Sequence, residues 1–573
     1  MRAGDYWEGV QVRRLGRTLT KFIGRALLAE LVLLGAVIGT PAKAATGGKV
    51  MWYSADLVQR LDLATQYLCA MLDKDRDDEP YFHITRREDG TAFAGHAIEI
   101  GIPHVTGRAL DALFFIEEVT GKRPPSHCEA TYTRYLLSCY DNEDHLPSYY
   151  DPRREGKRFV EFHNLREGLE GLTWLIKLRD NATARDYAHR MLQTLARITD
   201  ADGALSLELV RSIAREGVFH GIGEVQTVTA GRLVGALVKY YRVTGDPLAL
   251  ELADEYAHHV MSVSFTREGV LTDLAGNHIH SITSTLSGVL DFALMTSDWP
   301  LVEAVRRAYE VGLREFYSTY GWCKEQAWLE TDQGEVNQIG DLIQVQLLLA
   351  GRLGPSYYSQ AETWMRSGLL PSQVLESDFI EENPQPKGDF ERDMKQRIIG
   401  GFGFPTPSSH LQTPHSPINT IDITEGAVQA ICEFARHIVT RSDLGVQVNL
   451  LFSWENDLAR VDSDLPLRGR LRVTVKKAAN LLVRVPRHIE PGSLRATCEG
   501  KPVEGLEVAG YLLVPNDQAG PTFEITFEPQ AFTRREFVYH KPYEVRWFGE
   551  QATGISPVQG LYPLFGQWPG DEE

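Results

Sequence analysis

Hydrophobic residues recur at helical spacing over more than half of the chain. Between about residues 52 and 374 they return every three or four positions, which is the period of one face of an α-helix. One such series is Leu57, Leu61, Ala64, Leu68 and Met71. Polar turns at residues 244–247 and 296–300 each lie between two apolar helices. Pairs of helices repeat at roughly 50 to 65 residues, which predicts a toroid of helical hairpins.

The pattern changes after a long loop rich in Gly, Pro, Ser and His at residues 400–417. One more helix follows at 424–440, and after it come short runs rich in β-branched residues and bounded by turns. These runs are residues 446–452, 471–475, 481–485 and 523–527. The sequence therefore predicts a mainly α protein, with a helical toroid over residues 46–440 and a β-sandwich over 441–573.

The first 45 residues have the order of a secretory signal peptide. Basic residues precede an apolar run at 26–39, and small residues follow at 41–45. The apolar run is too short for a comfortable transmembrane helix, so we expect no stable membrane insertion. Residues 1–45 predict export to the periplasm or the medium, whereas translation from Met51 would leave a cytoplasmic protein.

Charge and motifs exclude several classes of function. The chain has 59 Lys and Arg against 77 Asp and Glu, a net charge of −18, so nucleic acid is not an expected partner and a neutral ligand is favoured. The six cysteines form no C-x-x-C pair, and neither a Walker motif nor a dinucleotide fingerprint occurs. We expect no cofactor and no metal. A monomer and a homodimer are equally compatible with the sequence.

Two histidines begin an apolar helix after residue 276. His278 and His280 have one residue between them, so at a helix start at least one should project toward the end of the toroid where loops converge. They are candidate ligand-binding residues, and solvated imidazoles near a helix cap are the alternative.

Carboxylates and tryptophans share the irregular segment that follows. Its candidate residues are Trp322, Glu325, Trp328, Glu330 and Glu335. Glycosidic cleavage uses paired carboxyl groups, and an aromatic ring stacks on a sugar while its apolar surface raises the pKa of a nearby acid. An ordinary charged surface loop is the alternative.

Two further clusters begin helices. Asp422 and Glu425 follow the long loop, where Asp422 or Thr424 could also serve only as a helix cap. His163 precedes an Asn, an Arg and a Glu at the start of another helix, and here a structural role is favoured over substrate binding.

The chain resembles the β-L-arabinofuranosidases of glycoside hydrolase family 127. The resemblance rests on the order of residues 104–113, 277–288, 317–325, 334–340, 422–439 and 445–450. The resemblance implies an (α/α)6 barrel followed by a β-sandwich. It also implies an enzyme that hydrolyses a plant-type glycan from the end of the glycan chain. Glu325 or Glu330 matches the family's acid/base Glu, while Glu335 matches its zinc-binding Glu.

The chain departs from the family at its chemical centre. The family uses a Cys nucleophile held by a zinc site of three Cys and one Glu, but residues 421–426 contain no Cys and Glu335 is followed by Val and Asn. A thiolate zinc site cannot form without thiolates. The resemblance therefore implies for Glu335 only that its carboxylate lines the site, and for His278 only that it is a histidine of the site.

We therefore expect a secreted glycosidase that degrades plant- or algal-type oligosaccharides or polysaccharides with two carboxyl groups. Glu325 is the expected proton donor, with Glu330 in reserve, and Asp422 the nucleophile or base, with Glu335 as alternative. His163, His278, His280, Trp322, Trp328 and Glu425 are the expected substrate-binding residues. The alternatives are a polysaccharide lyase on the same toroid, with His278 or Tyr317 as base and Lys324 on a uronate, and a non-catalytic glycan-binding protein.

Overall fold

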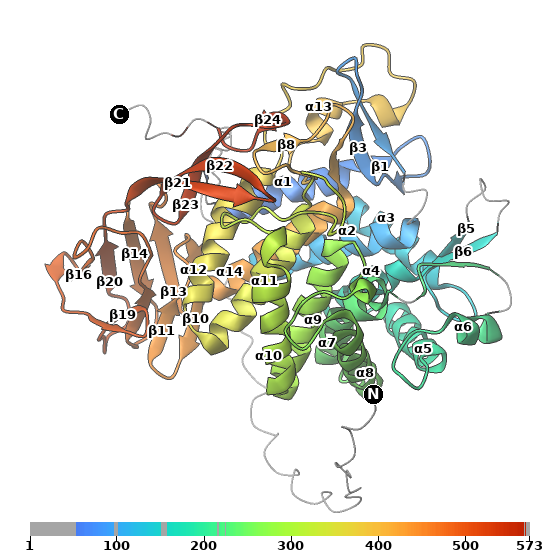
Figure 1. Ribbon diagram of the computed structural model, residues 1–573, viewed down its shortest axis with the longest axis horizontal. Coiled ribbons are helices and arrows are strands. Elements are labelled where there is room, and N and C mark those ends of the chain that lie inside the picture. Colours follow the sequence, from blue (N-terminus) through green and yellow to red (C-terminus); the bar gives the residue numbers. More distant parts are fainter. Residues whose placement is uncertain are drawn as a thin grey trace, which may run out of the picture. The chain divides into compact units, whose positions relative to one another are not determined.

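Six helices form a closed inner ring. The computed structural model describes residues 53–54, 56–96, 101–150, 157–214, 217–223, 225–566 and 568, so the predicted signal peptide lies outside the described residues. The inner helices are α2 (Ile102–Thr120), α4 (Leu165–Arg179), α7 (Ala230–Thr244), α9 (Ile279–Thr296), α11 (Val336–Leu353) and α14 (Ile421–Ile438). Each packs on the next, and α14 packs on α2 to close the ring (Figure 1).

Six amphipathic helices cover the ring from outside. They are α1 (Leu57–Ala70), α3 (Ser126–Tyr140), α5 (Ala182–Ile198), α8 (Pro247–Ser264), α10 (Trp299–Arg307) and α12 (Ser356–Trp364). Each packs beside one inner helix, α3 on α2 and α8 on α7 for example. The predicted (α/α)6 barrel is therefore confirmed. No helix in the described part of the chain is long and apolar enough to span a membrane.

Glycines let neighbouring inner helices touch. A Cβ built on Gly288 of α9 would lie 2.5 Å from the backbone nitrogen of Gly235 of α7, which leaves no room for a side chain. The two helices can therefore approach backbone to backbone.

Two sheets form the predicted sandwich directly after α14. The first has strand order β10 (Val439–Ser442), β11 (Gly445–Val448), β15 (Leu481–Arg484), β19 (Tyr511–Val514), β18 (Leu506–Val508). The second has the order β12 (Trp454–Glu455), β13 (Ala459–Ser463), β14 (Arg470–Val475), β20 (Thr522–Thr526), β16 (Arg495–Cys498), β17 (Lys501–Pro502). In β14, Leu471, Val473 and Val475 are buried and alternate with polar residues, as a half-buried sheet requires.

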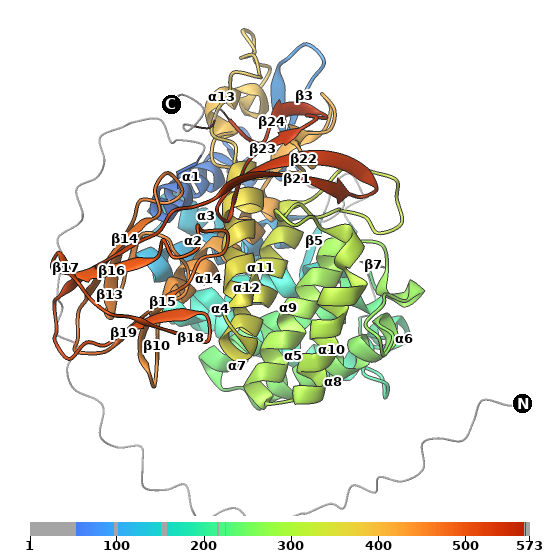
Figure 2. The same cartoon turned by 60° about the vertical axis from the view of Figure 1, so that its left-hand side comes forward.

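The last strands do not belong to the sandwich. The predicted sandwich over residues 441–573 is therefore too long. β21 (Ala531–Val538), β22 (Lys541–Phe548) and β23 (Gln551–Ser556) form a separate sheet that crosses the barrel beside α11 and α12 (Figure 2). Val545 and Trp547 of this sheet pack on Tyr320 and Trp322, which belong to the loop between α10 and α11. The chain thus returns to cover one wall of the barrel.

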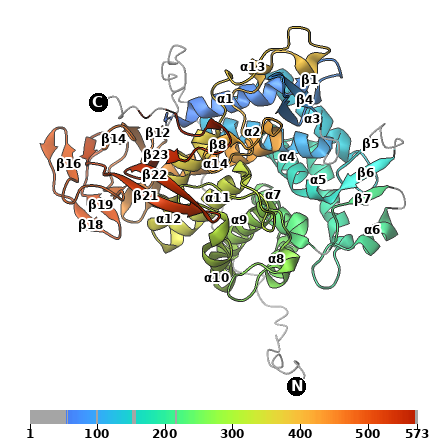
Figure 3. The same cartoon turned by 45° about the horizontal axis from the view of Figure 1, so that its top comes forward.

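Shorter strands complete the loops at the ends of the barrel. β3 (His83–Arg86) pairs with β4 (Ala92–Gly95) and with β9 (Pro417–Thr420), which leads into α14. The long loop before β9 also contains β8 (Ser409–Leu411), which pairs with β24 (Leu561–Pro563). β5 (Ser148–Tyr150), β6 (Arg158–Glu161) and β7 (Val218–His220) form a sheet on the side of the barrel away from the sandwich (Figure 3).

Candidate active site

Polar side chains gather where the six inner helices begin. Because all six run in the same direction, their first turns meet at one rim, and the positive ends of their dipoles favour carboxylates there. The residues concerned are His104, Arg108, Arg166, Glu167, Arg232, His278, His280, Glu335, Asn337, Asp341, Asp422 and Glu425. The predicted clusters at 163–167, 278–280, 335–341 and 422–425 thus come together.

Asp422 lies in the first turn of α14 and does not cap the helix. The cap is Thr420, whose hydroxyl accepts a hydrogen bond of 3.0 Å from the backbone nitrogen of Ile423. Asp422 Oδ1 instead lies 2.7 Å from Arg108 Nε and 3.1 Å from His104 Nε2. Burial alone would raise the pKa of Asp422, but Arg108 and His104 outweigh it and hold the pKa well below its usual range. Asp422 is therefore ionised, and its side chain is 15% exposed.

Glu335 and Asn337 connect Asp422 to His278. Glu335 precedes α11, and its Oε1 accepts a hydrogen bond of 2.8 Å from the Asn337 amide. The same amide group donates to Asp422 Oδ2 at 3.2 Å. Glu335 Oε2 lies 3.3 Å from Nε2 of His278, which flanks α9 and is 31% exposed. The predicted lining carboxylate is thus in contact with the predicted histidine of the site.

Glu325 approaches from the loop before α11. Its backbone carbonyl accepts a hydrogen bond of 3.0 Å from the backbone nitrogen of Ile279, so the loop is fixed to the start of α9. Its carboxylate accepts one of 2.7 Å from the Gln333 amide. Burial and then the charge of Glu335 raise the pKa of Glu325 above its usual value. Glu325 is therefore suited to hold a proton.

Three residues of the same loop occupy different positions. Glu330 is exposed on the outer side, where it accepts a hydrogen bond from the Tyr539 hydroxyl, so the structure does not bring this reserve acid into the site. Trp322 is only 1% exposed, and its indole donates to the carbonyl of Pro405, so its predicted stacking on sugar is wrong. Trp328 is 53% exposed at the rim and is free to stack.

His280 lies beneath the rim and not in it. Its Nδ1 donates to Asp341 at 2.9 Å, and its Nε2 faces a nitrogen of Arg108 at 2.9 Å and one of Arg166 at 3.3 Å. Burial and these arginine charges hold the pKa of His280 well below its usual value, so the ring is neutral. With 1% exposure, His280 supports the arginines and cannot contact a sugar, which corrects the prediction.

Glu425 is also a supporting residue. It is fully buried one turn after Asp422 and forms an ion pair with Arg108, whose guanidinium also contacts Asp422. The predicted contact of Glu425 with substrate is therefore wrong. A buried cation with two carboxylate partners is held in a fixed position, and this positions Arg108 against Asp422.

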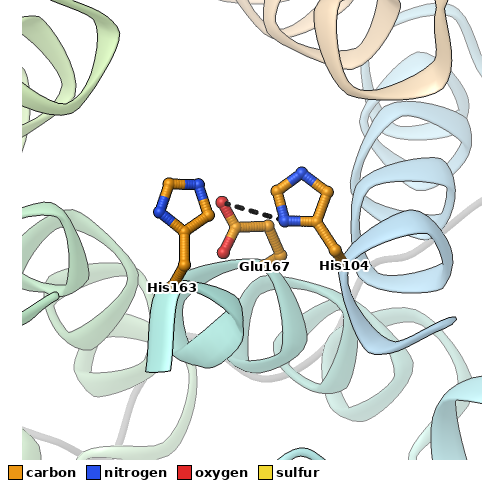
Figure 4. Close-up of side chains that lie close together, drawn as sticks. All are labelled: His104, His163 and Glu167. Atoms are coloured by element: carbon orange, nitrogen blue, oxygen red, sulfur yellow. Dashed lines mark ion pairs between the residues drawn. The ribbon is translucent and has the colours of Figure 1, made fainter. Parts of the chain in front are cut away.

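His104, His163 and Glu167 form a second part of the rim (Figure 4). The rings of His104 and His163 are stacked at 5.5 Å, and that of His278 lies 6.4 Å beyond His163. His163 is partly exposed and remains a candidate contact for substrate, although the sequence favoured a structural role. Arg232 lies against its ring.

This triad has the residue types of a metal site, but its surroundings do not suit a cation. The ligand atoms of His104, His163 and Glu167 lie within 4.8 Å of one another. Arg166 and Arg232 already contact Glu167, and Arg232 contacts His163. A divalent ion would have to replace these guanidinium groups or lie beside them. The residues present therefore do not fit a metal.

Asp111, Glu170 and Glu425 form a second group of close carboxylates, deeper in the barrel. There Lys239 Nζ lies 2.9 Å from Asp111 and 3.4 Å from Glu170, so an ammonium group already supplies the positive charge.

Sequence reasoning missed the buried arginine layer. Arg108, Arg166 and Arg232 lie on three different inner helices and surround one imidazole. One sequence pattern could have predicted part of this layer: the i, i+4 spacing of His104 and Arg108, which places both on one helix face. Arg166 belongs to the cluster after His163, for which the sequence favoured a structural role, and Arg232 follows an ordinary helical pattern. Only closure of the ring brings the three arginines together.

Comparison with known proteins supports the fold. No family model matches the chain, and no curated protein matches it. Among solved structures, the GH127 β-arabinofuranosidase BT3674 matches with a TM-score of 0.56 and 14% identity, over 88% of this chain and 83% of its own. A protein described as a glycoside hydrolase matches with a TM-score of 0.51 and 13% identity, over 84% of both chains. The chain therefore has the fold of these glycosidases, as the resemblance implied.

Proposed function

We propose that this protein is a glycoside hydrolase that uses Glu325 as proton donor and Asp422 as nucleophile or base. One observation carries the proposal: two carboxyl groups at the same rim have pKa values shifted in opposite directions. Such a pair is what glycosidic cleavage requires, since one group must donate a proton while the other stays ionised. The fold shared with glycosidases agrees with this chemistry.

The surrounding residues have supporting roles in this mechanism. Glu325 protonates the leaving oxygen, and Asp422 attacks the anomeric carbon or activates a water for the attack. Arg108 and His104 keep Asp422 ionised, while the Asn337 amide fixes its second oxygen. We propose that His278 and His163 bind sugar hydroxyls and that Trp328 stacks on a sugar ring.

We further propose a neutral plant- or algal-type glycan as substrate, with cleavage at its end. His280 and the arginines around it fill the barrel axis below the rim, so a chain cannot thread through. A chain end that enters the rim stops at this layer. The cationic side chains of the layer are paired with carboxylates, which leaves no evident partner for an anionic sugar.

The lyase alternative keeps His278, which is partly exposed beside Glu335, but its other two residues are placed less favourably. It required Lys324 to bind a uronate carboxylate, but the Lys324 ammonium lies 3.4 Å from the centroid of the Tyr539 ring. It also offered Tyr317 as the base, and this ring is packed between Tyr309 and Trp364 with 8% exposure. A non-catalytic glycan-binding protein is distinguished from a hydrolase by the absence of turnover.

Substitution of the two carboxyl groups tests the proposal. We expect Glu325→Gln to lower kcat on a natural glycoside by orders of magnitude and much less on a nitrophenyl glycoside, because a good leaving group departs without a proton. Asp422→Asn should be equally damaging on both substrates, since attack at the anomeric carbon does not depend on the leaving group. Steady-state kinetics on matched substrate pairs measures both effects.

Two further results sharpen this test. In a retaining enzyme, added azide should rescue Asp422→Asn and yield a glycosyl azide. Glu330→Gln is the matched control, because Glu330 lies on the outer side of the same loop, and it should behave as wild type. Near-normal turnover of both Glu325→Gln and Asp422→Asn would rule out the assignment.

We also propose that the protein is exported. The predicted signal peptide at residues 1–45 supports this, and so does a disulfide between Cys69 of α1 and Cys128 of α3. Disulfides persist in oxidising compartments and are rare in the cytosol.

A further inference from the structure

A cavity lies inside the barrel at the end opposite the candidate active site. Its volume is about 300 Å³, and it is lined by the later turns of the inner helices. Among its walls are Trp174 of α4, Lys239 of α7, Ser287 of α9 and Gln344 of α11. Its deep end reaches the arginine layer below the candidate active site, at Arg232. We call it the axial cavity.

The cationic side chains that line the axial cavity have carboxylate partners. Lys239 Nζ lies 2.9 Å from Asp111, and Arg242 lies 2.6 Å from Asp291. Of the other four cations, Lys177 and Arg436 share Glu118, and Arg166 and Arg232 share Glu167. Glu170 beside Lys239 and Glu433 beside Arg436 are the two further carboxylates that balance the six cations. Because these charges are compensated, the cavity does not select a charged ligand.

Neutral polar side chains line the cavity between these ion pairs. They are Ser284, Ser287, Gln344 and Gln429. Hydroxyl and amide groups offer hydrogen-bond donors and acceptors together, which suits the hydroxyl groups of a ligand, since these both donate and accept.

We propose that the axial cavity binds a small neutral polyhydroxylated molecule of monosaccharide size. The volume is at the lower end of the range of small-molecule sites. Gln344 is the central contact: its Oε1 accepts a hydrogen bond of 2.8 Å from the Ser287 hydroxyl, which holds these two lining side chains together. The cavity shares Arg166 and Arg232 with the layer below the proposed hydrolytic centre, but the proposal does not rest on the proposed function.

Titration calorimetry with D-xylose, a neutral pentose, tests the axial site. We expect millimolar binding to the wild-type protein and at least fivefold weaker binding to Gln344→Met, which keeps the side-chain length but removes the amide. The matched control is Gln346→Met on the same helix, because Gln346 is buried, contacts Tyr309 and does not line the cavity. Its affinity should equal that of wild type.

Further arms keep the test decisive. Ser287→Ala adds no volume and should also weaken binding, so a folding defect of Gln344→Met would not end the experiment. D-xylose bound at the candidate active site would appear as a component that Asp422→Asn alters and Gln344→Met does not. Equal binding by the two glutamine variants, no binding of D-xylose, or tighter binding of the anionic D-glucuronate would each overturn the proposal. The first two results would leave water as the occupant.

Discussion

Two aspartates of the inner ring show how position sets the state of one chemical group. Asp422 is at the partly exposed rim, where Arg108 and His104 hold its pKa well below the usual range despite burial. Asp341 is one layer deeper beside His280, and burial raises its pKa to about 7 although three arginines act against it. The two pKa values differ because Arg108 contacts Asp422 directly, whereas Asp341 contacts an imidazole and the Thr283 hydroxyl.

Asp341 gives the fold a defined pH dependence. An unfolded aspartate titrates near pH 4, so between about pH 4 and 7 the folded protein holds a proton that the unfolded chain releases. Stability from this group is therefore complete below about pH 4 and is lost as the pH rises to about 7. Asp341→Asn cannot ionise and keeps the oxygen that accepts from His280 and Thr283.

We therefore expect the melting temperature of Asp341→Asn, relative to wild type, to increase as the pH is raised from about 5 to 7.5. Thermal unfolding in a series of buffers of constant ionic strength measures this difference. A difference that stays constant with pH would show that Asp341 is ionised throughout the range.

The arginines around His104, His163 and Glu167 occupy the positions that a metal ion would need. Because guanidinium groups contact the same atoms that a metal would use, chelation should leave activity and melting temperature unchanged. Dialysis against EDTA, followed by assay and by elemental analysis, tests this. A large loss of activity that zinc restores would mean that the ion replaces the arginines in solution.

At the scale of elements, one hairpin of the C-terminal sheet supports the loop that carries Glu325. The Tyr539 ring, in the turn between β21 and β22, lies under the ammonium of Lys324, the residue next to Glu325. Its hydroxyl binds Glu330, and Lys541 forms an ion pair with Asp332 of the same loop. Lys324 is buried, and a desolvated cation over an aromatic ring contributes about 2 kcal/mol. The hairpin thereby positions the proposed acid from a distant part of the chain.

Removal of the Tyr539 ring should therefore affect proton donation more than stability. We expect Tyr539→Ala to lower kcat on a natural glycoside by about two- to tenfold and to leave a nitrophenyl glycoside nearly unaffected. Tyr539→Phe keeps the ring over Lys324 and should resemble wild type. Equal losses on both substrates would mean that the hairpin acts on folding and not on Glu325.

The periodic elements could be predicted from the sequence, and so could the residues at their starts. His278, Glu335 and Asp422 each mark the beginning of an inner helix, and a toroid brings such positions together. Exposure within the irregular loop could not be predicted. Trp322 and Trp328 are equivalent in sequence, but only Trp322 is covered, because Val545 and Trp547 arrive from more than 200 residues later in the chain.

At the scale of the whole described fold, buried charges join the barrel to the sandwich. Arg484 of β15 is 1% exposed and lies 2.7 Å from Glu362 of α12 and 2.9 Å from Glu550, which precedes β23. Loss of one partner would leave an uncompensated buried charge, which costs about 3 to 5 kcal/mol. This contact unites three segments that are distant in sequence, and no local pattern indicates it.

The disulfide between α1 and α3 connects the fold to the proposed export. Its cysteines are 59 residues apart, and closing a loop of that length contributes about 4 kcal/mol in the chain-entropy model. We expect protein from the native host to begin near Ala45 and, after denaturation, to show four free thiols, those of Cys139, Cys323, Cys432 and Cys498. N-terminal sequencing and thiol titration measure both quantities.

If the disulfide forms only in the exported protein, the effect of removing it on the melting temperature should depend on the compartment in which the protein is made. Cys128→Ser should lower the melting temperature of protein made in an oxidising periplasm by several degrees and leave that of protein made in a reducing cytoplasm unchanged. Cys498→Ser, at a half-buried free thiol, is the matched control and should have no effect in either compartment. Export would be refuted if protein from the native host retained Met1 or Met51. It would also be refuted by six titratable thiols in the native protein, because the disulfide would then have had no oxidising environment in which to form.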